Sequence, residues 1–236
     1  MARCGGPGDA IFSVPPSPVV LQLSAVRARN LVYTAPLLFL ACSQPALDPG
    51  MTFLVGLGHY QSEMARLESR PERWADRQRL GESLKASYLV TLGESREFNR
   101  LVDLDVKRRE FLVTMRQLPL SVERVKAMNE ELAAMESQIQ ELKQVVKAQV
   151  ARLHDGPQDA TRQAERVAAI GLVHLALERF SATYPYAPPS AVAIGPYLVT
   201  DHGSFAQVAT PVGDTYRCVP VLVAGEGAAI ECEKSR

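Results

Sequence analysis

The clearest hydrophobic pattern in the chain lies between residues 121 and 154, where apolar positions recur at alternating spacings of three and four. This stripe, called the seam below, consists of Val125, Met128, Leu132, Met135, Ile139, Leu142 and Val146. Ser121 is a suitable N-cap, and Glu123 falls in the first turn, where the helix dipole favours negative charge. A repeat of about 3.5 residues keeps facing a neighbouring helix only if both helices supercoil. The pattern therefore predicts a long helix with a coiled-coil partner.

A candidate partner helix lies directly upstream of the seam. Its apolar residues have the same spacing, interrupted by Arg108: Leu101, Leu104, Phe111, Met115 and Leu118. The short joint at Pro119 favours an antiparallel hairpin. Helical stripes within 72–92 and 164–177 would complete a three- or four-helix bundle. A heptad pattern is equally compatible with helix pairing within one chain and between chains, so the sequence also allows a homo-oligomer.

The pattern changes after residue 184, where Pro185, Pro188 and Pro189 end the helical region. Short β-branched and aromatic runs separated by Gly, Asp and Pro follow, at 197–200, 204–209, 216–223 and 228–232. Such runs predict a small antiparallel meander. The expected fold class is thus mainly α with a small β part: a helical hairpin or coiled-coil bundle followed by a small antiparallel β meander.

Two cysteines fall in the expected meander. If the last hairpin is centred on Gly225, Cys218 lies directly across from Cys232. Facing cysteines oxidise in an exported protein, and closing a loop of about 15 residues contributes about 3 kcal/mol in the chain-entropy model. The alternative, a metal or redox site, has only His202 nearby and no C-x-x-C motif. We expect a disulfide.

The first 42 residues have the features of a targeting segment. Residues 1–25 are rich in Gly, Pro and Ser without periodicity, and we expect them to be an unstructured preamble before a true start at Val26. Arg27 and Arg29 precede an apolar run at 31–41, which predicts a secretory signal. The run is shorter than the about 20 residues that a membrane-spanning helix needs.

The sequence Leu38-Phe39-Leu40-Ala41-Cys42 resembles the lipobox of bacterial lipoproteins, with Phe39 where leucine is usual. The resemblance implies that Cys42 is lipidated, becomes the mature N-terminus and anchors the chain to a membrane. Ser43 in the next position implies the outer membrane, facing the periplasm. Alternatively, residues 31–42 are a buried segment of a cytoplasmic protein, with translation starting near Met51.

The net charge and the residues that could be catalytic or ligand-binding exclude some classes of function. The 26 basic and 26 acidic residues cancel, so we expect no nucleic-acid partner. Asp201, His202 and Ser204 are residue types of a hydrolytic triad, but neighbours in an extended chain point to opposite faces, so we expect a turn with a solvated histidine. The run 107–109 is flanked by acids, which predicts a solvated helix face. We expect no catalytic residues, metal site or cofactor.

The expected organisation is a preamble and signal over 1–42, a tether over 43–50, a helical coiled-coil region over 51–183 and a disulfide-closed β unit over 184–236. The leading hypothesis is a non-enzymatic, lipid-anchored envelope protein that acts as a coiled-coil spacer, assembly or docking component for an envelope protein partner. One alternative is a ligand- or peptidoglycan-binding module in the β unit, with a pocket lined by Tyr197, Phe205 and Tyr216. The other is a cytoplasmic coiled-coil regulator.

Overall fold

The computed structural model describes residues 47–117, 121–156, 159–182, 189–223 and 227–235. All of these belong to one compact unit, Ser43–Arg236. They form α-helices followed by a five-stranded antiparallel sheet, which confirms the predicted fold class. The predicted preamble, signal and lipidation site at Cys42 lie outside the described residues.

Five α-helices occur in the described residues: α1 (Pro49–Leu67), α2 (Trp74–Leu92), α3 (Arg96–Gln117), α4 (Val122–Ala151) and α5 (Ala160–Arg179). Side-chain caps fix several helix starts, since the oxygens of Asp48, Ser121 and Asp159 accept hydrogen bonds from backbone N–H groups of the first turn. The α1 helix begins inside the predicted tether, because Asp48 caps it and Pro49 suits the first turn. The tether is therefore shorter than 43–50.

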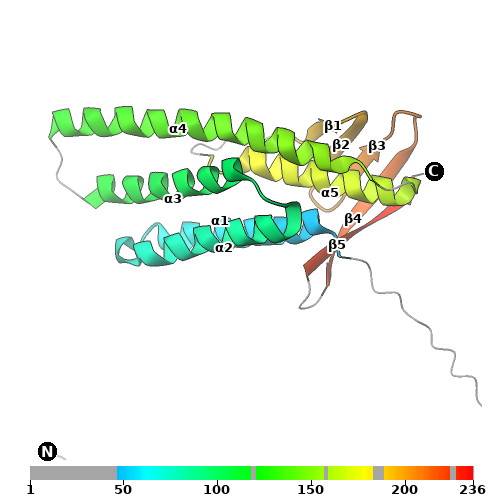
Figure 1. Cartoon of the computed structure of the whole chain (residues 1–236), viewed down its shortest axis with the longest axis horizontal. Helices are drawn as coiled ribbons and strands as arrows, with labels where there is room; N and C mark the ends of the chain where they lie inside the picture. The colour runs from blue at the N-terminus through cyan, green and yellow to red at the C-terminus, as the bar shows by residue number, and fades with distance from the viewer. Residues whose placement is uncertain (1–46, 118–120, 157–158, 183–188, 224–226, 236) are drawn as a thin grey trace, which may run out of the picture. The chain divides into compact units, whose positions relative to one another are not determined.

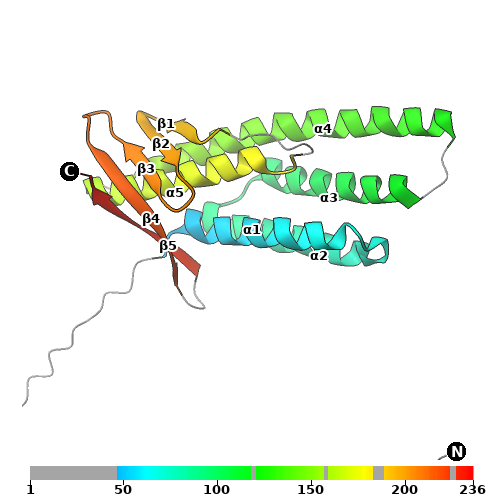
Figure 2. The ribbon, with the colours of Figure 1, turned by 180° about the vertical axis from the view of Figure 1, so that it is seen from behind.

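The helices run side by side, as Figures 1 and 2 show. The α1 helix packs against α2 and α5, and the α3 helix packs against α2 and α4. The chain reverses direction between α3 and α4, in agreement with the predicted hairpin, although the joint at 118–120 is outside the described residues. The 3₁₀ turns Pro71–Arg73 and Arg152–His154 lead into α2 and out of α4.

The sheet has the strand order β1-β2-β3-β4-β5. Its strands are β1 (Ala191–Ile194), β2 (Tyr197–Asp201), β3 (Ala206–Ala209), β4 (Thr215–Val223) and β5 (Gly227–Lys234). The sequence analysis missed β1, whose alanines carry little strand signal. The α5 helix covers the inner face of the sheet at close range: a Cβ on Gly171 would lie 2.7 Å from the Cβ of Val199.

One hydrophobic core joins the helices to the sheet. Phe53 of α1, Phe98 of α3, Val173 of α5 and Val208 of β3 are all fully buried in it. At the sheet edge, the Asp48 N–H donates to the Ala228 oxygen at 3.0 Å, so the start of α1 lies against β5. The predicted β unit therefore shares its core with the bundle.

Candidate functional site

The disulfide between Cys218 and Cys232 joins neighbouring strands, β4 and β5, on the inner face of the sheet. Cys218 is fully buried and Cys232 is 7% exposed. Their residues are directly opposed in the strand register, which confirms the pairing derived from the hairpin centred on Gly225. The bond therefore cross-links the edge strand to the core of the sheet.

The seam of α4 faces other helices of the same chain. Met128, Met135, Ile139 and Val146 are buried, and the remaining seam residues, Val125, Leu132 and Leu142, are half-buried. The α4 helix packs against α3 and α5, so these helices cover the buried seam positions. The part of the seam that is buried is therefore satisfied within one chain.

A buried acid that the sequence analysis missed joins α3 to α1 and to the segment just beyond α5. Asp105 of α3 has no exposed surface. Its carboxylate accepts hydrogen bonds from the Tyr60 hydroxyl at 2.8 Å, the Ser181 hydroxyl at 2.5 Å and the Arg109 Nε at 2.9 Å. Burial, followed by the neighbouring Asp105, raises the pKa of Tyr60 above its ordinary value. The phenol therefore stays protonated and donates to the carboxylate.

The prediction of a solvated helix face at 107–109 is wrong for two of its three residues. Lys107 is 61% exposed along its side chain, but Arg108 is only 3% exposed overall. The Arg109 guanidinium pairs with Glu68 of α1 at 2.5 Å, and the Arg108 guanidinium lies 3.5 Å from Glu136 of α4. Arg108 interrupts the apolar stripe of α3 because its partner carboxylate comes from the facing helix.

Buried cations also bind the carbonyl groups at helix ends. Arg77 is 2% exposed and donates to the Leu67 oxygen at 3.2 Å, at the end of α1. Lys143 is 2% exposed and donates to the Glu178 oxygen at 2.7 Å, in the last turn of α5. Burial lowers the pKa of Lys143. Both cations meet the negative ends of helix dipoles, so their arrangement indicates a role in holding helices rather than in acid–base chemistry.

The Asp201–Ser204 segment forms the predicted turn. Asp201 accepts a hydrogen bond from the Gly203 N–H at 2.8 Å and pairs with Arg179 at 3.2 Å. The His202 ring is exposed and stacks on Phe205. Because Asp201 binds the turn backbone and Arg179, the triad geometry does not form.

The three rings proposed to line a pocket lie on opposite faces of the sheet. Tyr197 shares the inner face with Val199, and Tyr216 is buried on that face. Arg217 follows Tyr216 and therefore points to the outer face, where its guanidinium lies 4.7 Å from the centre of the Phe205 ring. Phe205 is thus separated from the two tyrosines by the sheet itself. The predicted three-ring pocket is not formed.

The outer face of the sheet mixes exposed apolar side chains with charged ones. Leu198 is 49% exposed and Val219 is 40% exposed on this face. Arg217 lies next to Val219 on the same face of β4 and stacks on Phe205. It forms no ion pair within the described residues, and the exposed acids Glu233 and Glu231 of β5 lie opposite Arg217 and Val219 in the strand register. The face therefore presents a guanidinium stacked on an aromatic ring, with apolar side chains and two exposed carboxylates around it.

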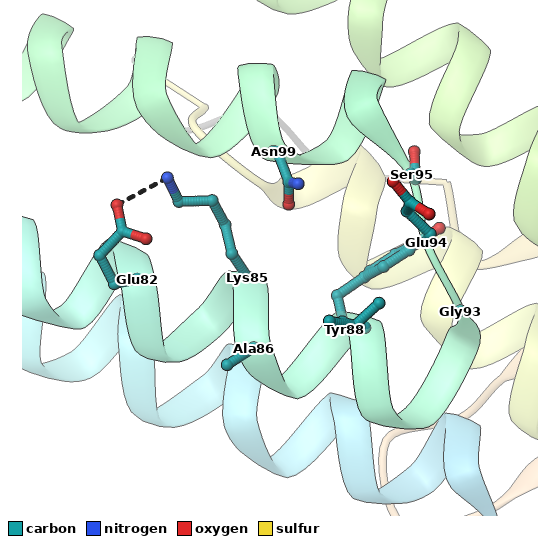
Figure 3. Close-up of a pocket in the computed structure, with 9 residues that line it drawn as sticks. Glu82, Lys85, Ala86, Tyr88, Gly93, Glu94, Ser95 and Asn99 are labelled. Carbon is teal, nitrogen blue, oxygen red and sulfur yellow. Dashed lines mark ion pairs between the residues drawn. The ribbon is translucent and has the colours of Figure 1, made fainter.

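A groove of about 440 Å³ lies between α2 and α3 (Figure 3). Its lining residues are Glu82, Lys85, Ala86, Tyr88, Leu89, Gly93, Glu94, Ser95 and Asn99. Lys85 pairs with Glu82 at 2.7 Å and with Asp103 at 2.7 Å, and this bridges the two helices at one end of the groove. None of these residues belongs to the predicted sites.

In the parts of the chain that the structure describes, no helix combines the length and apolar character needed to cross a bilayer. Within the same residues, no group of three or more His, Cys, Asp or Glu side chains is arranged to hold a metal ion. Comparisons with family models, curated proteins and solved structures return no match.

Proposed function

We propose that the protein is an exported, lipid-anchored component of the bacterial cell envelope, in which the helices support a sheet that docks a second envelope protein. The observation that carries the proposal is the Cys218–Cys232 disulfide inside the shared core. Disulfides form and persist in oxidising compartments, which an exported chain reaches. The signal-like segment ending at Cys42 supplies the route.

The short tether constrains where the folded unit acts. Only residues 43–48 separate Cys42 from the start of α1 at Pro49. At the full extension of about 3.4 Å per residue, this tether reaches about 20 Å. Since the start of α1 lies against β5, the chain enters the folded unit next to the sheet. The expected partner is therefore a protein at the same membrane surface.

The outer face of the sheet suits such a partner. Arg217 is held over the Phe205 ring, which lowers the ordering cost of a contact with a carboxylate. Val219 supplies apolar surface beside it on β4, and Leu198 supplies more on β2 of the same face. Aromatic and arginine side chains are enriched at the centres of protein interfaces. The partner is expected to present an Asp or Glu to Arg217 and apolar residues to Val219.

The described polar side chains support a non-enzymatic role. Asp105 accepts three hydrogen bonds inside the core, and Lys143 binds a helix-end carbonyl. These buried ionisable groups are bound to one another and to the backbone. They therefore act as helix contacts in this proposal.

Fatty-acid labelling in an enteric bacterial host tests the anchor. The wild-type chain should incorporate label and fractionate with the outer membrane, Cys42→Ala should do neither, and Ser43→Asp should shift the labelled protein to the inner membrane. Cys4→Ala is the matched control and should behave like the wild type. An unlabelled wild-type protein with free thiols at Cys218 and Cys232 would instead support the cytoplasmic regulator.

A photoreactive residue placed at Val219 tests the docking face in intact cells. It should form one protein adduct, which the same residue at Val90, 84% exposed on α2, should not form. Adding Arg217→Gln should remove the adduct, whereas Arg100→Gln, on the exposed side of α3, should leave it intact. Equal adducts at both positions, or an adduct insensitive to Arg217→Gln, would refute docking through this face.

A further inference from the structure

The hairpin formed by β4 and β5 has two chemically different halves. The half near the C-terminus carries charged side chains: Arg217, Glu231, Glu233 and Lys234. The other half, called the hairpin end below, consists of residues 220–223 and 227–230, and none of these residues is charged. The turn that joins its strands, 224–226, lies outside the described residues. Charged side chains normally protect an edge strand from unwanted contacts, and the described part of the hairpin end lacks them.

Leu222 is the large apolar side chain that the hairpin end exposes. It is 76% exposed, whereas Ala228, directly opposite it in the strand register, is 1% exposed. The alternation of side chains along β4 places Leu222 on the inner face with Cys218, and Val219 of the docking face on the outer one. In Figures 1 and 2 this end of the two strands extends past the start of α1. Leu222 therefore lies beyond the cover of the helices, and it is separate from the docking face.

The chain enters the folded unit in contact with the hairpin end. The Asp48 N–H donates to the Ala228 oxygen at 3.0 Å. A Cβ on Gly227 would lie 3.6 Å from the side chain of Leu47, which is itself 42% exposed. The chain from Cys42 to Leu47 reaches about 17 Å at full extension. A lipid on Cys42 would therefore hold the hairpin end close to the membrane surface.

We propose that the hairpin end contacts the lipid bilayer, with Leu222 and Leu47 at the boundary between the headgroups and the acyl chains. The contact depends on the proposed lipid anchor at Cys42. Uncharged apolar side chains suit this boundary, because they leave water there without needing a shaped pocket. The contact is a second membrane attachment beside the acyl chains, and it orients the folded unit with the hairpin end toward the bilayer.

Tryptophan fluorescence in vesicles tests the contact on the whole lipidated protein. Trp74 is the only tryptophan of the sequence, so Trp74→Phe combined with Leu222→Trp gives a protein with one fluorophore, at the hairpin end. The protein is purified from an enteric host and reconstituted into phosphatidylethanolamine and phosphatidylglycerol vesicles, with or without lipids brominated on their acyl chains. Bromine quenches tryptophan at near contact, so the brominated lipids should lower the fluorescence about twofold when the side chain reaches the acyl boundary.

Val122→Trp, in the same Trp74→Phe background, is the matched control. Val122 is 82% exposed at the start of α4, which lies at the far end of the helices from the sheet (Figure 1), so this variant should not be quenched. Thermal melts check that the variants stay folded. Leu47→Trp in the same background should also be quenched, and it decides the test if Leu222→Trp unfolds the protein.

Flotation of the same vesicles reports the lipid anchor separately. Protein that floats with the vesicles, but whose Leu222→Trp variant is quenched no more than Val122→Trp, would overturn the bilayer contact and leave the anchor in place. Protein that does not float would overturn both.

Discussion

Asp105 on α3 and Ser181 just beyond α5 are joined by a hydrogen bond of 2.5 Å across 76 positions of sequence. Ser181 has a φ of 58°, the left-handed value that L-residues avoid, and is the non-glycine residue with positive φ in the described part of the chain. The bond to a buried carboxylate explains why a serine holds this conformation. The pair thus fixes how the chain leaves α5 toward the sheet.

Two substitutions at Ser181 distinguish the contribution of this hydrogen bond to stability from the cost of the strained backbone. Ser181→Ala loses a hydrogen bond to a charged group but keeps the strain, and should lower the free energy of unfolding by about 2 kcal/mol. Ser181→Gly loses the same bond but relieves about 1 kcal/mol of strain, so it should cost less. Urea denaturation measures both. If Ser181→Gly is the more damaging variant, the assigned roles are wrong.

Alanine substitutions at two helix glycines should change the stability of the fold in opposite directions, because only one of them packs closely against the sheet. Gly171→Ala places a methyl group 2.7 Å from the Cβ of Val199 and should destabilise the fold by about 1–3 kcal/mol. In α1, a Cβ on Gly58 meets nothing within 4 Å, so Gly58→Ala should stabilise the fold by about 0.5–1 kcal/mol. Thermal unfolding of the pair checks this. Similar shifts of the same sign would contradict the packing described.

His174 should make stability depend on pH. Burial, followed by repulsion from Lys147, lowers the pKa of His174 below its ordinary 6.5, although Glu178 opposes this. The unfolded chain then binds the proton more readily, so the histidine's contribution is present above pH 6.5 and is lost as the pH falls toward the lower, folded value.

Comparing the wild type with His174→Gln by urea denaturation at about pH 7.5 and about pH 5.5 checks the sign. The wild type should lose more stability than the variant between these two conditions. A larger loss in His174→Gln would show that the histidine is protonated more readily in the folded protein.

The disulfide should be a major contributor to stability. Replacing both Cys218 and Cys232 with serine should lower the free energy of unfolding by about 2–5 kcal/mol, because the loop between them is no longer closed in the unfolded chain. Chemical denaturation of this variant, and of wild type with and without reductant, measures the effect. A change below about 0.5 kcal/mol would mean that the packed core alone determines stability.

Most of the fold could be predicted from the spacing of hydrophobic residues along the sequence. The three-four spacing from Val125 to Val146 predicted α4, and the proximity of the next stripe predicted its pairing with α3. The Gly225-centred hairpin placed Cys218 opposite Cys232. These features depend on spacing along the chain, which a sequence displays directly.

The polar interior depends on which helices meet, and spacing alone does not encode this. In the sequence, Asp105 and Arg109 are surrounded by charged residues, a pattern typical of a solvated helix face. In the fold they bind Tyr60, Glu68 and Ser181, which are distant in the sequence. The groove around Tyr88 likewise forms only where α2 and α3 pack together. A charged residue inside an apolar stripe, such as Arg108, is the one signal in the sequence that pointed to this interior.

Intact-mass analysis of the protein purified from membranes of an enteric host tests the central claim most directly. The account predicts a mature chain that begins at Cys42, carries acyl chains on that residue and is two hydrogens lighter than the reduced form because Cys218 and Cys232 are bonded. An unmodified chain beginning at Met1 or Met51, with two free thiols in the C-terminal strands, would contradict it.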